Sequence, residues 1–285
     1  MTGSVALEQP SGKVSDVILA MREDKELLSC IQCGTCSGVC PFGYLMDFPP
    51  SKMIAALRSG TFERVIRAKS AWLCISCSAC TAACPTQIPI TEHLMTPTKE
   101  QLVLIGEVPT ELQSALEFSQ RYGNPLGESP RKRANWVREA NIEVPILDKS
   151  NPIVDYLWFV GDYASFHPRN LQATAAFAKI LQKLGINYGI LGKDESSDGE
   201  SQRLAGENGL FELMAEKNGK EFAKYTFKAI VTTDPHAYNA LKNHYPKLGI
   251  EYPVLHYTEL LAANLDKISP LLTKEIKAKV TFHDP

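Results

Sequence analysis

Two short stretches contain all 8 cysteines of this 285-residue chain, and they constrain its fold more than any other feature. The first runs from Cys30 to Pro41 and the second from Cys74 to Pro85. Both have the spacing Cys-x2-Cys-x2-Cys-x3-Cys-Pro. Three thiolates in one tight loop, with a fourth supplied from a distance, suit a cubane iron–sulfur cluster.

A doubled run of this kind is typical of proteins with two clusters, in which the fourth cysteine of each run ligates the other cluster. On that rule we expect two 4Fe–4S clusters. The first would be held by Cys30, Cys33, Cys36 and Cys84, and the second by Cys74, Cys77, Cys80 and Cys40. The same eight cysteines are the expected metal ligands, and no catalytic residue is assigned.

Three simpler interpretations of the cysteines compete. Zinc also takes four thiolates, but its sites usually pair two Cys-x2-Cys knuckles. Disulfides need an oxidising compartment and tolerate such dense spacing poorly. Buried free cysteines would not explain two identical spacings. The repeated four-ligand run therefore favours iron–sulfur clusters.

Composition bounds the class and the location. Hydrophobic residues make up 44% and charged residues 22%, as in soluble globular proteins, and the formal net charge of −2 gives no basic field for nucleic acid. We see no signal peptide and no apolar run near the ~20 residues of a membrane span. Reduced thiolates then predict a cytoplasmic protein, at most at the inner face of the membrane. Oxygen-sensitive clusters suggest anaerobic metabolism.

The first half is expected to be helical around the cysteine runs. Residues 1–14 are expected to form a mobile arm, and 15–96 a cluster domain. Helices are predicted over Ser15–Leu28, Ser51–Gly60 and Thr61–Ala71, the first two capped by Ser15 and Ser51. This pattern resembles the α-helical ferredoxin domain of the iron–sulfur subunits of succinate dehydrogenase and heterodisulfide reductase.

Two features of this half have a simple interpretation and a functional alternative. The apolar segment from Pro41 to Pro50 is interpreted as cover over a cluster, with a docking surface for an electron partner as the alternative. His93 is interpreted as a satisfied surface or core side chain, because both clusters already have four thiolates.

Residues 97–150 are predicted to form a helical linker, with helices over Pro97–Gly106 and Thr110–Arg121. Its basic stretch contains Arg131, Lys132, Arg133 and Arg138. We interpret that stretch as a solvated helical face, since charge runs usually face solvent. Contact with an acidic partner protein or a nucleotide phosphate is the alternative.

Residues 151–285 alternate strand and helix, which predicts parallel pairing in a Rossmann-like α/β domain and an α+β protein overall. Strands are expected at 155–160, 187–191, 229–233, 253–256 and from Val280 to Phe282. Helices are expected at 170–184, 207–218, 236–243 and 258–264. The first strand is not followed by Gly-x-Gly-x-x-Gly, so dinucleotide binding is not indicated.

This half resembles the first half of the CCG domain, named for a Cys-Cys-Gly signature, of heterodisulfide reductase subunits and related iron–sulfur proteins. The matching stretches include Phe159-Val160-Gly161, Gly199 to Gly206, Ile230 to Thr233 and Pro235-His236. The departures are at the cysteines. Where the family has thiolates, this chain has Asp162, Ser197, Asp198, Asp234 and Ala237.

A half-domain without cysteines cannot hold the cluster that the resemblance would otherwise imply. The aspartates could bind a hard metal, but we interpret them as helix caps. In the family, a phrase like Thr281 to Pro285 opens a second CCG half. We therefore expect the CCG-like domain to be incomplete at its C-terminal end.

These observations predict an electron-transfer subunit that relays electrons through two 4Fe–4S clusters in a larger redox complex. The resemblance implies a heterodisulfide-reductase-like oxidoreductase, with a flavoprotein, an iron–sulfur subunit or a quinone or haem subunit as partner. Whether the chain is itself an enzyme stays open. One alternative is an oxidoreductase that reduces a disulfide at a further cluster beyond residue 285. Another is a non-redox role, with clusters that staple the fold or sense oxygen.

Overall fold

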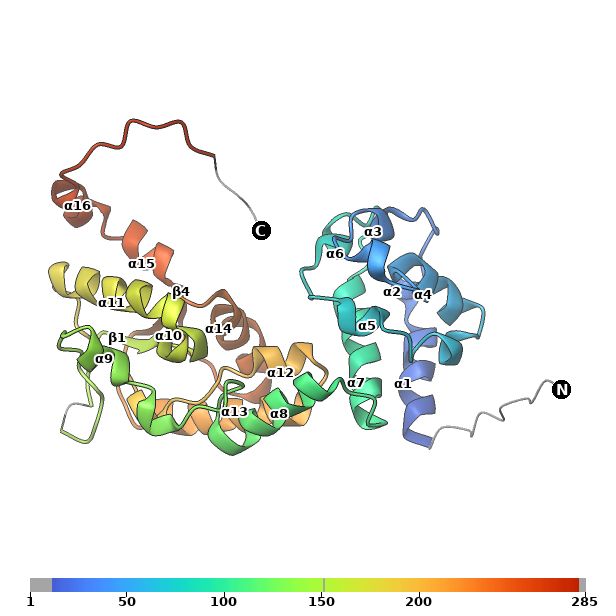
Figure 1. Ribbon diagram of the computed structural model, residues 1–285, viewed down its shortest axis with the longest axis horizontal. Helices are drawn as coiled ribbons and strands as arrows, with labels where there is room; N and C mark the ends of the chain where they lie inside the picture. Colours follow the sequence, from blue (N-terminus) through green and yellow to red (C-terminus); the bar gives the residue numbers. More distant parts are fainter. Residues whose placement is uncertain (1–11, 151, 282–285) are drawn as a thin grey trace. The chain divides into compact units, whose positions relative to one another are not determined.

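A computed structural model of the chain describes residues 12–150 and 152–281 (Figure 1). It divides into two compact units. We call Met1–Leu116 with Ser201–Phe211 the cysteine unit, and Glu117–Glu200 with Glu212–Pro285 the sheet unit. Residues 1–11 of the expected mobile arm lie outside the described residues, and residues 12–14 already belong to the first helix.

The cysteine unit is built from short helices joined by tight turns. They are α1 (Gly12–Glu23), α2 (Lys25–Leu28), α3 (Thr35–Gly38), η1 (Gly43–Leu45), α4 (Pro50–Arg58), η2 (Phe62–Arg64), α5 (Ser70–Leu73), α6 (Ala79–Ala82), η3 (Thr91–Met95) and α7 (Thr96–Leu104). The apolar faces of these helices meet in one core. Its least exposed side chains are Leu27, Met53, Ile54, Leu57, Phe62 and Leu94.

Three of the predicted helices in this unit need correction. The helix expected from Ser15 begins at Gly12 and is interrupted at Asp24, whose Oδ1 accepts hydrogen bonds from the backbone N–H groups that open α2. The cap of α4 is Pro49 rather than Ser51. The helix expected over Thr61–Ala71 is only the single turn η2, followed by turns up to α5.

The sheet unit contains four strands, β1 (Tyr156–Phe159), β2 (Tyr188–Gly189), β3 (Ala229–Thr232) and β4 (Val254–His256). All pairs are parallel and the order is β2-β1-β3-β4, which confirms the predicted parallel sheet. Successive side chains of a strand point to opposite faces. On β1, Trp158 packs against Phe177 of α11, and its neighbour Phe159 packs against Phe222 of α13. The two helices therefore cover opposite faces of the sheet.

Helices follow each strand of this unit and connect it to the next. They are α9 (Asn135–Glu139), α10 (Asp162–Phe166), α11 (Pro168–Lys183), η5 (Gly192–Asp194), α14 (Pro235–Asn239), η6 (Ala240–His244), η7 (Tyr245–Leu248), α15 (Tyr257–Ala262), α16 (Leu265–Ile268) and η8 (Ser269–Leu271), with η4 (Pro130–Lys132) before them. Helices α8 (Thr110–Tyr122), α12 (Glu200–Leu204) and α13 (Asn208–Phe222) carry the chain from one unit to the other.

The strand predicted from Val280 is wrong for the residues that can be compared. Residues 272–281 form neither helix nor strand, and Ile276 and Val280 are among the most exposed apolar side chains. Phe282 lies outside the described residues. An apolar run predicts a strand only where a neighbouring strand offers it hydrogen bonds, and none of the described strands pairs with this segment.

Candidate iron–sulfur centres

The two cysteine runs repeat the same backbone. Gln32 and Ser76, two residues after the first cysteine of each run, both have φ of 57°, and Gly34 and Ser78 follow with φ of 79° and 58°. These left-handed turns curl each run into a loop before a four-residue helix, α3 or α6. The backbone N–H groups of Gln32 and Ser76 each lie 3.4 Å from the sulfur of the first cysteine in their own run.

Burial repeats along the two runs as well. The third cysteine of each run, Cys36 and Cys80, is buried, and the second, Cys33 and Cys77, is exposed. The other four are half-buried, and all eight are free thiols. The same positions are therefore buried and exposed in both runs, as expected of two copies of one ligand loop.

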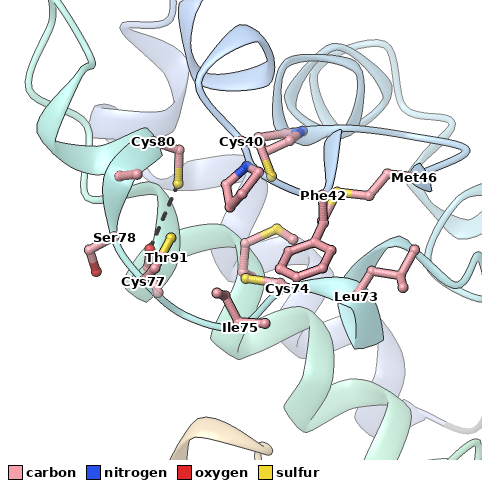
Figure 2. Close-up of a pocket in the computed structure, with 14 residues that line it drawn as sticks. Cys40, Phe42, Met46, Leu73, Cys74, Ile75, Cys77, Ser78, Cys80 and Thr91 are labelled. Atoms are coloured by element: carbon pink, nitrogen blue, oxygen red, sulfur yellow. Dashed lines mark hydrogen bonds between the residues drawn. The ribbon is translucent and has the colours of Figure 1, made fainter. Parts of the chain in front are cut away.

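The structure brings Cys40 to the second run. Cys40, Cys74, Cys77 and Cys80 line one pocket, together with apolar side chains such as Phe42 and Ile75 (Figure 2). Burial raises the pKa of the Cys80 thiol, Thr91 opposes that shift, and the charges of Cys74 and Cys77 add to it. These four cysteines are the expected second ligand set, and the assignment itself stays a prediction.

The first run meets Cys84. Hydrogen bonding to Thr35 lowers the pKa of Cys33, while the nearby charge of Cys84 acts in the opposite direction. Burial raises the pKa of the Cys36 thiol to about 11, with smaller contributions from Cys80 and Cys30. Cys84 thus interacts with the first run and Cys40 lies beside the second, while Cys36 and Cys80 are close enough to influence each other.

The spacing of the sulfurs bears on the choice of metal group. Across the described residues, no three cysteine sulfurs lie within 4.8 Å of one another. Four thiolates around one zinc ion, each about 2.3 Å from it, would lie only about 3.8 Å apart in a tetrahedron. The donors are all soft thiolates, and their wider spacing fits a multi-atom iron–sulfur group better than a single ion.

The sulfurs differ in the side chains that approach them. Near the first set, Gln32 Nε2 lies 3.3 Å from Cys30 Sγ, Thr35 Oγ1 lies 3.3 Å from Cys33 Sγ, and Thr86 Oγ1 lies 3.3 Å from Cys84 Sγ. Near the second set, Thr91 Oγ1 lies 3.8 Å from Cys80 Sγ. Hydrogen bonds to ligand sulfurs are one determinant of cluster potential.

A buried cation lies beside the second run. Lys99 on α7 is 6% exposed, and its Nζ donates to Cys74 O at 2.9 Å, Leu204 O at 3.1 Å and Ser76 Oγ at 3.3 Å. Burial lowers the pKa of Lys99, and the negative charge of Cys74 opposes that shift. Sequence reasoning missed this residue, because nothing in the pattern around position 99 indicates burial of an ammonium group.

The segment from Pro41 to Pro50 has two kinds of side chain. Phe42 and Met46 line the pocket of the second set, whereas Tyr44 and Leu45 are exposed. His93 is not part of either cysteine set. Its Nδ1 lies 2.8 Å from Asp24 Oδ2 and 3.2 Å from Glu26 Oε2, as expected for a histidine satisfied by its neighbours.

In the sheet unit, Arg133 corrects the interpretation of the basic stretch as a solvated face. Arg131, Lys132 and Arg138 are exposed, but Arg133 is 2% exposed. Its guanidinium donates to Asp162 Oδ1 at 2.7 Å and to Glu195 Oε1 at 3.0 Å. The Glu195 carboxylate also accepts from the backbone N–H groups of Val160 and Gly161, both at 2.9 Å.

The remaining carboxylates at the lost cysteine positions are also held by the fold. Asp234 accepts from the backbone N–H groups of His236 and Ala237 and so caps α14, as predicted. Burial, with the charges of Asp234 and Asp162, raises the pKa of Asp198 well above its usual range. In the part of the chain that is described, these three aspartates do not form a group within 4.8 Å that could hold one metal ion.

Comparison with known proteins supports both halves of this description. The 4Fe-4S dicluster domain family matches residues 29–89, and the family described as a cysteine-rich domain matches residues 156–242. The second match contains no cysteine, because all eight lie between residues 30 and 84.

Similar proteins are iron–sulfur oxidoreductases or their subunits. The probable iron-sulfur-binding oxidoreductase FadF of Bacillus subtilis is 29% identical over 96% of this chain and 46% of its own length. The EtfAB:quinone oxidoreductase of Syntrophomonas wolfei is 32% identical over 77% of this chain and 31% of its own. One subunit of the dihydromethanophenazine:CoB–CoM heterodisulfide reductase of Methanosarcina mazei is 28% identical over 74% and 51%.

The chain therefore spans between about a third and about a half of the length of these relatives. None of the helices in the described ranges is both long and apolar enough to cross a membrane. The domain matches and the relatives agree with the resemblance seen in the cysteine runs and in the α/β half. The chain is an iron–sulfur protein related to heterodisulfide reductase, in which a 4Fe–4S dicluster domain precedes a CCG-type domain without cysteines.

Proposed function

We propose that this chain transfers electrons between redox partners through two 4Fe–4S clusters, each ligated by four cysteines. The observation that carries the proposal is the grouping of Cys40 with the second run around one pocket, and the interaction of Cys84 with the first. Each run thus takes its fourth ligand from the other. The two ligand sets are Cys30, Cys33, Cys36 and Cys84 for the first cluster, and Cys74, Cys77, Cys80 and Cys40 for the second.

When bound, such clusters accept and release single electrons. The protein's own residues fix the sulfurs, exclude water with side chains such as Phe42 and Met46, and donate hydrogen bonds to the ligands. No described side chain is assigned the role of nucleophile or general base, so the chemical transformation belongs to a partner. The chain thus serves as one module of a heterodisulfide-reductase-like redox complex.

Partners of this module are a flavoprotein, another iron–sulfur subunit, or a quinone or haem subunit. The names of the relatives support this, since one is an EtfAB:quinone oxidoreductase and another a heterodisulfide reductase subunit. We place the module in the cytoplasm or at the inner face of the membrane. A relative from Chromohalobacter salexigens, called a probable membrane-anchored ferredoxin, supports the second location.

The domain boundaries belong to the same proposal. Residues 1–14 are an arm, 15–96 the two-cluster domain, 97–150 a helical linker, and 151–285 an incomplete Rossmann-like CCG domain. The parallel order β2-β1-β3-β4, with helices on both faces, supports the Rossmann-like description.

Anaerobic purification followed by iron analysis and an EPR-monitored redox titration tests the function. Two four-iron clusters give about eight iron atoms per chain and two reversible one-electron signals. About four iron atoms would refute the two-cluster assignment. Clusters that stay in one oxidation state over physiological potentials would instead support a stapling or sensing role.

A second candidate is an oxidoreductase that reduces a disulfide or a similar acceptor at a further cluster beyond residue 285. The observation that favours it is the length of the heterodisulfide reductase relative, of which this chain spans 51%. Reading the codons that follow Pro285 decides it. A continuation with a Cys-Cys-Gly signature supports this candidate, and its absence removes it.

A further inference from the structure

The two cysteine runs share a backbone but meet different cations. In each run the carbonyl oxygen of the first cysteine accepts a hydrogen bond from a basic side chain on a following helix. Arg58 Nη1 donates to Cys30 O, and Lys99 Nζ donates to Cys74 O. Arg58 is exposed, whereas Lys99 is buried.

The surroundings of Lys99 suit its charged form. An ammonium group has three N–H donors, and Lys99 has three oxygen acceptors, Cys74 O, Ser76 Oγ and Leu204 O. None of these acceptors is a carboxylate, so they satisfy the donors without cancelling the positive charge. The result is a cation whose charge is felt by the loop that holds Cys74 and Cys77.

Burial decides how much such a charge matters. The interaction of two charges grows as the effective dielectric constant falls, and exposed charges are also screened by salt. Lys99 and Arg58 contact equivalent carbonyls, yet only Lys99 acts from inside the protein. Its effect on a nearby redox group should therefore be much the larger.

We propose that Lys99 sets the reduction potential of the cluster on Cys40, Cys74, Cys77 and Cys80, making it a better electron acceptor than the same loop with a neutral side chain. This inference rests on the proposed electron-transfer function. In the step concerned, a one-electron donor such as a reduced flavin is oxidised and the cluster is reduced. No bond forms or breaks and no proton moves. The cluster becomes one unit more negative, and the fixed cation stabilises that state.

The test is an EPR-monitored redox titration of the whole, anaerobically purified chain with dithionite as reductant. Lys99→Met removes the charge, Lys99→Gln keeps N–H donors without charge, and Lys99→Arg keeps the charge. The signal that disappears in Cys77→Ser identifies the second cluster. Arg58→Met is the matched control on the first run.

We expect Lys99→Met and Lys99→Gln to lower the ratio of reduced to oxidised second cluster about tenfold at a fixed potential, which is about 59 mV for one electron. Lys99→Arg should stay near the wild type. Arg58→Met should move the first cluster by much less. The first cluster should not respond to substitutions of Lys99 beyond the change seen in Lys99→Arg.

Three results would overturn the inference. One is a second-cluster potential in Lys99→Met and Lys99→Gln equal to that of the wild type. Another is a wild-type potential in Lys99→Gln alone, which would assign the effect to hydrogen bonding. The last is loss of about four iron atoms in both neutral variants, which would make Lys99 a support of the loop only. Failure of the proposed function appears separately, as missing iron or missing redox signals in the wild type.

Discussion

The cysteine unit and the sheet unit handle buried negative charge in opposite ways. In the cysteine unit, loops with left-handed turns gather thiols around pockets suited to a metal cluster. In the sheet unit, the loops that carry thiolates in the resembling family carry Asp162 and Asp198, and the guanidinium of Arg133 pairs with Asp162 and Glu195. A side-chain cation thus does in one unit what a metal group is proposed to do in the other.

The largest effect should come from removing a thiolate. Cys33→Ser and Cys77→Ser should each lose one cluster, lowering the iron content from about eight to about four atoms per chain and stopping electron transfer. Iron analysis of anaerobically purified protein measures this. Asp198→Ala is the control from the sheet unit and should keep all the iron. If iron fell in that variant, the sheet unit would be holding metal and the contrast between the units would fail.

Removing the cation of the sheet unit should cost the most stability. Arg133→Met leaves the buried carboxylates of Asp162 and Glu195 without their partner, and breaking such a buried pair costs about 3–5 kcal/mol in the free energy of unfolding. Urea unfolding followed by tryptophan fluorescence reports it, because Trp136 and Trp158 are buried in this unit.

The neighbouring Lys132 supplies the control for that substitution. Lys132 is exposed and pairs with Glu128 at 2.9 Å, so Lys132→Met should cost less than about 1 kcal/mol. Equal losses for the two variants would show that Arg133 contributes as an ordinary surface charge. Iron content should stay unchanged in both.

Asp198 predicts a pH dependence confined to the sheet unit. Its pKa is raised in the folded state, chiefly by burial. As pH rises above the ordinary carboxyl pKa of about 3.9, the unfolded chain releases this proton first. This group's contribution to stability is therefore present at low pH and is lost as pH rises toward the folded-state pKa.

Asp198→Asn should remove that loss, since its Oδ1 can still accept from the backbone N–H of Glu200. The stability of the variant relative to the wild type should increase as pH rises from about 5 to about 8. Unfolding free energies of both proteins over this range measure the difference. Parallel curves would mean that Asp198 does not titrate differently in the folded and unfolded states.

The smallest effect concerns a hydrogen bond to sulfur in the cysteine unit. Gln32→Ser gives the first run the residue that the second has at the same position, Ser76, whose φ is also 57°. It removes the bond from Gln32 Nε2 to Cys30 Sγ but keeps the backbone bond. The first cluster should become harder to reduce by about 0.5–1.5 kcal/mol. A redox titration in which the first potential rises would contradict this.

Local patterns allowed the sheet and the cysteine loops to be predicted, but not the cations. The apolar runs at Tyr156–Phe159 and Ala229–Thr232 indicate buried strands wherever they lie in a chain. Arg133 and Glu195 are 62 positions apart, and Lys99 and Leu204 are 105 apart. No local pattern marks such pairs, so a buried cation looked like a solvated one.

Asp24 and Val280 show the same limit in two other forms. At Asp24 the helical periodicity continues on both sides, and only the side chain's bonds to the N–H groups of Glu26 and Leu27 divide the helix. At Val280 the residues favour a strand, but strand formation needs a partner, and the described chain supplies none. In both places, hydrogen-bonding partners outweighed intrinsic preference.

The assignment of Ser201–Phe211 to the cysteine unit has a practical consequence for dissecting the protein. The chain passes between the units after Leu116, after Glu200 and after Phe211. No single cut, by a protease or by truncation, can therefore release either unit whole. A fragment ending at Leu116 would contain every cysteine, yet Lys99 would lack the carbonyl of Leu204. Cluster ligation and cluster environment are thus written into separate parts of the chain.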